Sequence, residues 1–193
     1  MGSLGRPPVR ESGAAIPSQT TWAIDPGHTR AEFTGRHLTV VSVRGRFVGV
    51  RGEIVEHHDD LPASTVSVDI DATTLWSGLD KRDESLRGPD FLDVERYPQI
   101  TFRSTRVVPL ASDHFTVLGT LTVRDVARPI ALDVQRNGDL RNLRGTRVAG
   151  FTARTTVDRR DFGMTWNREL PGGGWLTSHE IDLELEVFAA EKV

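Results

Sequence analysis

The sequence has no cysteine among its 193 residues, which excludes disulfide bonds, thiolate nucleophiles and cysteine-ligated metals. No stretch approaches the run of ~18 apolar residues that a membrane-spanning helix needs. The charge is nearly balanced, with 24 Lys and Arg against 27 Asp and Glu, so the surface as a whole does not attract nucleic acid or anionic lipid. We therefore expect no membrane span and no nucleic-acid partner.

Common catalytic and nucleotide-binding motifs are also missing. The chain contains no G-x-S-x-G, P-loop, G-x-G-x-x-G or H-E-x-x-H pattern. The segment His57-His58-Asp59-Asp60 offers metal-ligating side chains, but it lies at a turn, and we interpret it as a solvated hairpin tip. His28 and His37 would lie on opposite faces of one unbroken strand. We expect no catalytic residue, no metal and no required cofactor.

The beginning of the chain differs in composition from the rest. Its first 20 residues are rich in Gly, Pro, Ser and Arg, and charged residues interrupt any apolar stretch that could serve as a secretory signal. We expect residues 1–20 to form a disordered tail, residues 21–190 to form one domain, and the protein to be cytoplasmic.

From Thr21 onward, apolar and polar residues mostly alternate. Residues 65–72 and 180–187 show this pattern without a fault. Side chains in a strand alternate between its two faces, so each segment has one apolar and one wet face, as in an antiparallel sheet with one solvated side. We predict eight strands, at 22–37, 43–56, 64–72, 98–108, 113–124, 128–137, 144–158 and 177–190.

Many strands at near-regular spacing indicate a barrel or a sandwich. We favour a closed barrel, because an open sheet of eight one-sided strands would expose two unpaired edges. The segment 77–89 breaks the alternation and predicts a short amphipathic helix near one end of the barrel, with Gly88-Pro89 as its stop signal.

The alternation predicts an inward row of apolar side chains, but it cannot distinguish a packed barrel from a hollow one. Both occur among eight-stranded barrels. The row consists of Val66, Val68, Ile70, Ile100, Phe102, Val117, Leu121, Ile130, Leu132, Ile181, Leu183 and Leu185.

Several motifs, in this order and spacing, resemble those of the YceI-like family. They are Trp22-Ala23-Ile24-Asp25-Pro26-Gly27-His28-Thr29, Phe33, His37, Val43-Arg44-Gly45-Arg46-Phe47, Arg82-Asp83, Asp90-Phe91-Leu92-Asp93-Val94-Glu95-Arg96-Tyr97-Pro98, Gly119-Thr120-Leu121-Thr122-Val123-Arg124, Arg128-Pro129-Ile130 and Asp161-Phe162-Gly163-Met164-Thr165-Trp166-Asn167.

The resemblance implies an all-β, extended, eight-stranded antiparallel lipocalin-like barrel whose hollow interior binds a polyisoprenoid lipid, either an isoprenoid quinone or a prenyl phosphate. It adds Phe33 and Phe47 to the predicted wall. At the mouth, we expect the ligand to meet His37, Arg82, Asp83, Phe91, Met164, Trp166 and Asn167. Relatives often carry histidine where this chain has Ser85, so any contribution of that histidine to head-group binding is lost or changed.

Three functions remain open on these grounds. The first is a carrier or sequesterer of an apolar lipid, which is not an enzyme. The second is an enzyme that acts on a quinone or prenyl substrate through a group such as His37. The third is an interaction protein with a filled barrel. We also consider a homodimer.

Overall fold

The computed structural model describes residues 18–38 and 40–192. Its strands form one antiparallel sheet. They are β1 (Gln19–Ile24), β2 (Arg30–His37), β3 (Val41–Phe47), β4 (Val50–His57), β5 (Thr65–Asp71), β6 (Gln99–Pro109), β7 (His114–Val123), β8 (Val126–Arg141), β9 (Arg147–Asp158) and β10 (Glu180–Glu191).

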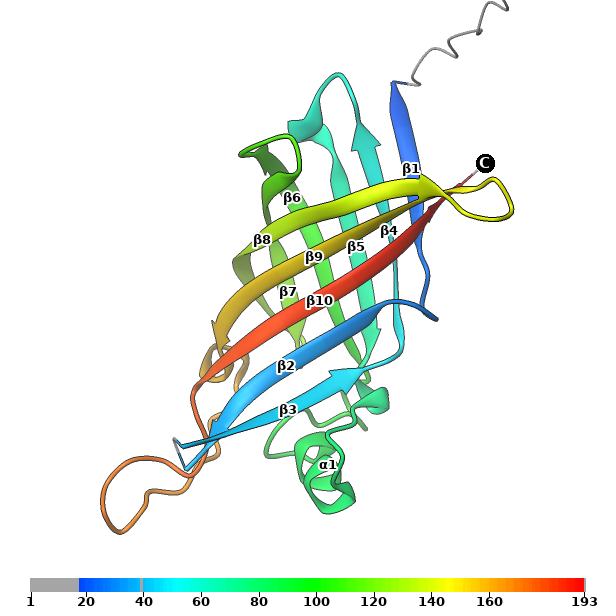
Figure 1. Cartoon of the computed structure of the whole chain (residues 1–193). Coiled ribbons are helices and arrows are strands. Elements are labelled where there is room, and N and C mark those ends of the chain that lie inside the picture. The colour runs from blue at the N-terminus through cyan, green and yellow to red at the C-terminus, as the bar shows by residue number, and fades with distance from the viewer. Residues whose placement is uncertain (1–17, 39, 193) are drawn as a thin grey trace, which may run out of the picture.

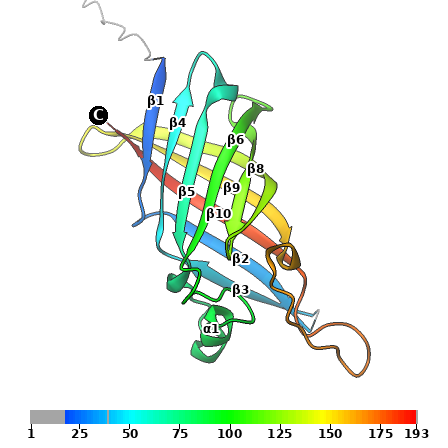
Figure 2. The ribbon, with the colours of Figure 1, turned by 180° about the vertical axis from the view of Figure 1, so that it is seen from behind.

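Eight of these strands close into a barrel, as predicted. The ring runs β1-β4-β5-β6-β7-β8-β9-β10 and returns to β1, where Trp22 lies opposite Glu191 of β10. Closure leaves no free edge on these eight strands around the ring. Figure 1 shows β8, β9 and β10 crossing the front of the barrel and β5 and β6 behind them, and Figure 2 shows the reverse side.

The first two predicted strands are each broken into two, which the alternation did not reveal. Between β1 and β2, the Asp25 carboxylate accepts a hydrogen bond from the Gly27 backbone N–H at 2.8 Å and contacts His28 Nδ1 at 2.7 Å. Between β3 and β4, the backbone N–H groups of Val48 and Gly49 both donate to Thr74 Oγ1. Both breaks rest on side-chain contacts that the strand period does not encode.

The breaks split the barrel into a closed half and an open half. Near its C-terminal end β10 pairs with β1, and near its start it pairs with β2, so β1 and β2 occupy the same side of β10 in succession. The β2–β3 hairpin therefore continues past the closed ring (Figure 1). In the described part of the chain, a single bridge, from Arg46 to Trp76, holds the outer edge of β3.

The predicted helix is α1 (Asp80–Arg87), and it lies at this open end (Figures 1 and 2). Its first turn is anchored by Asp83, which is 2% exposed and accepts hydrogen bonds from the backbone N–H and Oγ of Ser77. At its C-terminus the Gly88 N–H donates to Glu84 O at 3.0 Å. Short 3-10 turns lie at Leu61–Ala63 (η1), Ala72–Thr74 (η2) and Arg159–Phe162 (η3).

The domain begins earlier than expected, because Gln19 and Thr20 belong to β1. The rest of the predicted tail, residues 1–17, lies outside the described residues. Among residues 18–38 and 40–192, no helix is long and apolar enough to cross a bilayer.

Candidate ligand-binding site

A cavity of about 690 Å³ lies inside the α1 half of the barrel. Its volume falls within the range of about 300–1,000 Å³ that is typical of small-molecule sites. Twelve of the fourteen residues predicted for the inward row and wall line it, Ile181 among them. The others are Phe33, Phe47, Val68, Ile70, Ile100, Phe102, Leu121, Ile130, Leu132, Leu183 and Leu185.

The other two predicted wall residues do not line the cavity. Val117 is 4% exposed and belongs to the packed core, and Val66 packs against the same core. Both face inward, but they lie in the closed half, where side chains fill the barrel. The barrel is thus packed in one half and hollow in the other.

Two glycines help to keep the lumen open by letting phenylalanine rings lie against the wall. A Cβ atom at Gly45 would stand 2.2 Å from Cζ of Phe33, and one at Gly119 would stand 2.5 Å from Cζ of Phe102. The Phe33 ring therefore occupies the space of a side chain at Gly45, its partner across the β2–β3 pair, and the Phe102 ring occupies the space of a side chain at Gly119, which pairs with Ser104.

Five of the seven predicted mouth residues line the cavity, namely His37, Arg82, Phe91, Met164 and Trp166. The rings of Phe91 and Trp166 lie 5.5 Å apart. Arg82 already makes two hydrogen bonds within the protein: its Nε donates to Ser77 Oγ at 2.7 Å and its Nη2 donates to Ser77 O at 2.6 Å. Ser85, the position where relatives often have histidine, also lines the cavity.

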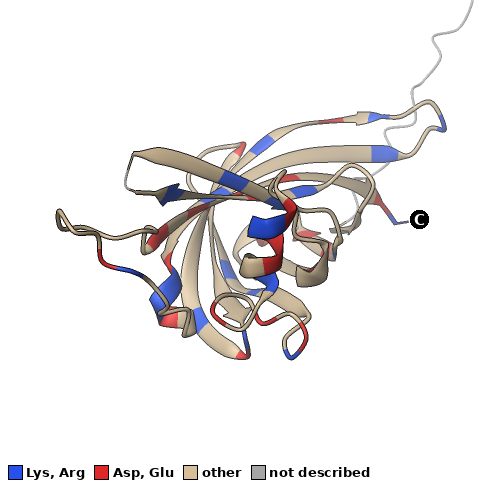
Figure 3. Ribbon diagram, turned by 90° about the horizontal axis from the view of Figure 1, so that it is seen from below, with Lys and Arg blue, Asp and Glu red and all other residues tan. Residues whose placement is uncertain are grey.

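Asp83 and Asn167 do not line the cavity; they shape the segments around its mouth. Asp83 anchors α1 through Ser77. The Asn167 side chain donates to Thr177 O at 2.8 Å and accepts from the Thr177 N–H at 3.1 Å, which ties the two sides of the loop 163–179 together. Figure 3 views this end of the molecule and shows that α1 carries charges of both signs.

One buried charge at the mouth was not predicted. Arg159 is 3% exposed and lines the cavity. Its Nε donates to Ser178 O at 2.8 Å, its Nη2 donates to Thr177 Oγ1 at 3.1 Å, and its Nη1 donates to Met164 O. Burial lowers the pKa of the guanidinium from its ordinary value. The strand period contained the signal, because Arg159 continues the inward row of Thr155 and Val157 by one step.

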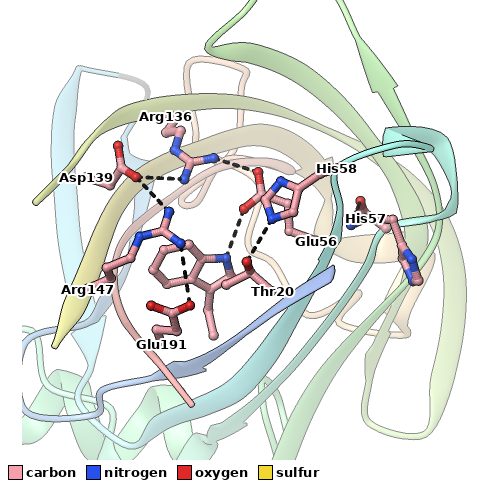
Figure 4. A network of polar contacts seen from close by, with 10 residues as sticks. Thr20, Glu56, His57, His58, Arg136, Asp139, Arg147 and Glu191 are labelled. Atoms are coloured by element: carbon pink, nitrogen blue, oxygen red, sulfur yellow. Dashed lines mark hydrogen bonds and ion pairs between the residues drawn. The ribbon is translucent and has the colours of Figure 1, made fainter. Parts of the chain in front are cut away.

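At the opposite end, an inward-facing polar network closes the barrel (Figure 4). The Glu56 carboxylate accepts from Trp22 Nε1 at 3.0 Å and from Arg136 Nη1 at 2.7 Å. Arg147 extends the network through ion pairs with Asp139 at 3.2 Å and Glu191 at 3.4 Å.

The network is built around an indole ring. Trp22 is 0% exposed, and the guanidinium carbons of Arg136 and Arg147 lie 5.7 and 5.1 Å from its ring centroid. Sequence reasoning missed this cluster because it assigned charged residues to the wet face. Glu56 and Glu191 in fact continue the inward rows of β4 and β10. The cavity therefore opens at the α1 end and stops short of the β1 end.

Comparisons with known proteins agree with this architecture. The family model described as a YceI-like domain matches residues 22–189. The UPF0312 protein of Pseudomonas putida strain GB-1 is 32% identical over 160 residues, which cover 83% of this chain and 80% of the relative. A UPF0312 protein of Vibrio cholerae is 31% identical and covers 86% of this chain and 83% of the relative.

Solved structures show the same fold. BcnA of Burkholderia cenocepacia superposes with a TM-score of 0.74 at 17% identity, covering 86% of this chain and 98% of that one. The Campylobacter jejuni YceI protein has a TM-score of 0.67 at 26% identity, with 82% and 90% covered. A domain from Saccharophagus degradans, described as polyisoprenoid binding, has a TM-score of 0.64 at 16% identity, with 89% and 98% covered. The chain belongs to the YceI-like family.

Proposed function

We propose that this protein binds one long lipid of polyisoprenoid type, with the tail in the cavity and the head group at the mouth, as a carrier or store. The observation that carries the proposal is the apolar cavity of about 690 Å³, open at the α1 end and closed at the other by the Trp22 network. The description of the Saccharophagus degradans domain as polyisoprenoid binding supports the same ligand class. We propose no chemistry on the ligand.

The volume sets the length of chain that fits. An apolar cavity of about 150 Å³ holds benzene, with its six carbons, so about 690 Å³ holds roughly 25 to 30 carbons. That length corresponds to roughly five or six isoprene units, and a longer chain would protrude at the mouth.

Apolar contact alone does not explain why such a lipid would leave a membrane. Burying a methylene group gains about 0.8 kcal/mol relative to water, but the bilayer offers the tail an equally apolar environment. Preference for the barrel must therefore come from the shape of the cavity and from polar groups at its mouth.

Native mass spectrometry of protein purified without detergent tests the proposal. We expect an adduct whose mass corresponds to one prenyl lipid. Ile130→Trp, which places a large ring on the cavity wall, should abolish the adduct, whereas Leu118→Trp on the outer face of the neighbouring strand should retain it. A wild-type protein that binds no prenyl lipid, even when one is added, would contradict the proposed function.

A further inference from the structure

The buried guanidinium of Arg159 faces the cavity without a carboxylate partner in the described part of the chain. The groups that accept its hydrogen bonds are the carbonyl oxygens of Ser178 and Met164 and the hydroxyl of Thr177, all of which are neutral. Removing a cation from water is costly unless an opposite charge compensates for it. Arg159 therefore carries a positive charge that the described residues solvate but do not neutralise.

The carboxylate nearest to Arg159 in the sequence, that of Asp158, forms hydrogen bonds with another arginine. Asp158 accepts from Arg160 Nε at 3.0 Å and from Arg160 Nη2 at 2.5 Å, and these bonds lower the pKa of Asp158 to about 2. Its charge is thus paired with Arg160. Desolvation is the largest influence on the pKa of Arg159 and lowers it; the charge of Asp158 raises that pKa but does not offset the desolvation.

The guanidinium also has N–H groups that make no hydrogen bond to the described residues. An arginine has five N–H donors, and three of those of Arg159 are directed at Ser178, Met164 and Thr177. Each Nη atom thus has a second N–H that donates to no acceptor among the described residues. The planar fork of arginine suits an oxyanion, which can accept two such bonds at once.

The other charged side chains that face the cavity are also cations. Lys81 and Arg82 also line the cavity, together with His37; Arg36 borders it too, but it is exposed and lies on the outer face of β2. The carboxylate among the lining residues is Glu32, which is exposed and lies on the outer face, between the inward-facing Ala31 and Phe33. The chain as a whole has a formal net charge of −3, so this concentration of cations is a local property of the cavity.

We infer that Arg159 is the counter-charge of a binding site for an oxyanion head group, so that the preferred ligand is a prenyl phosphate rather than a neutral prenyl alcohol or quinone. The inference rests on the proposed function, because it requires the lipid tail to occupy the cavity. The residue acts by binding the ligand, and no bond is made or broken.

Binding of three probes to the full chain tests this site. Geranylgeranyl phosphate and geranylgeraniol have the same tail and differ in the head group, and a saturated fatty acid of equal length carries a carboxylate instead. We expect the phosphate to bind the wild-type protein about tenfold to a hundredfold more tightly than the alcohol, as hydrogen bonds to a charged group allow. Arg159→Met should remove this preference and leave the affinity for the alcohol within about twofold.

The control is Arg154→Met, which removes a charge of the same sign from the outer face of β9, the strand that leads into Arg159, where Arg154 pairs with Glu184 at 2.6 Å. It should retain the preference for phosphate. Arg159→Lys, which keeps the charge but loses the planar fork, should give an intermediate preference and serves if Arg159→Met does not fold. Tight binding of the fatty acid would extend the site to carboxylates, and weak binding would restrict it to phosphates; both outcomes support an oxyanion site.

Two results would overturn the inference. One is equal affinity of the wild-type protein for the phosphate and the alcohol, and the other is a preference for phosphate that survives in Arg159→Met. In both cases the alcohol still binds, so the proposed function stands. If none of the three probes binds the wild-type protein, the proposed function itself fails, and the inference fails with it.

Discussion

Replacing Gly45 by alanine should shorten the lipid tail that the barrel can hold. A Cβ atom at this position would lie 2.2 and 2.5 Å from two carbons of the Phe33 ring, and its three nearest atoms all belong to that ring. Contacts this short do not occur, so the ring must move. Because Phe33 faces the interior of the barrel, the space available to it is the cavity.

The size of the effect follows from the size of the ring. Six ring carbons need about 150 Å³ in an apolar cavity, which is about one fifth of the 690 Å³ available. The loss is equivalent to roughly one isoprene unit. At about 0.8 kcal/mol for each buried carbon, a ligand long enough to fill the wild-type cavity would bind up to about 4 kcal/mol more weakly, whereas a short ligand would be unaffected.

Calorimetric titration with prenyl alcohols of increasing length measures this directly. For the wild-type protein we expect affinity to rise with length up to roughly five or six isoprene units and then to level off. For Gly45→Ala the plateau should come one unit earlier. The double variant Gly45→Ala, Phe33→Ala removes the displaced ring and should restore the longer plateau. An unchanged plateau in Gly45→Ala, or a shortened one that the double variant does not restore, would refute the reasoning.

Three further predictions concern the ends of the barrel. Glu56→Ala removes the acceptor of both Arg136 and an indole N–H at the closed end, and should lower the free energy of unfolding in urea by about 2–4 kcal/mol; a loss below about 0.5 kcal/mol would show that the network contributes little. The pKa of Asp158 is lowered from 3.8 to about 2, chiefly by hydrogen bonds from the arginine two positions later, so the stability that its charge provides is present above pH 3.8 and is lost as the pH falls toward 2. Asp158→Asn should therefore flatten the fall in melting temperature between these pH values. An unchanged fall below pH 3.8 would contradict the contribution assigned to the Asp158 carboxylate. Asn167→Ala should speed amide hydrogen exchange at Thr177 but not in β5 or β6, and equal protection in both proteins would mean that the loop is held by other contacts.

The alternation of apolar and polar residues was sufficient to predict the closed barrel and most of the wall of the cavity. It placed Val68 and Leu121 correctly because each needs a dry face, and a strand offers one at every second position. The same period could not show where the barrel becomes hollow. Val117 and Leu121 have the same phase on β7 and both belong to the buried core, but only Leu121 lines the cavity.

The polar residues of the interior were missed for a different reason. We assigned charged side chains to the wet face, which holds in mid-strand but not at the strand ends. Arg159 and Glu191 obey the strand period and face inward, where distant segments supply their partners. The contacts of Arg159 with the loop ending at Ser178, and of Arg147 with Glu191, link positions 19 and 44 residues apart. No local pattern encodes such pairs.

The closed end has a consequence for how a ligand would be exchanged. A tube with one entrance would take up a lipid with its tail leading and release it with its head group leading, so no ligand could pass through from one end to the other. Donor and acceptor would have to meet the same face of the protein in turn. A second tail could not enter while the first remained, so the barrel would deliver its lipid in single copies, each with its head group presented outward for whatever receives it.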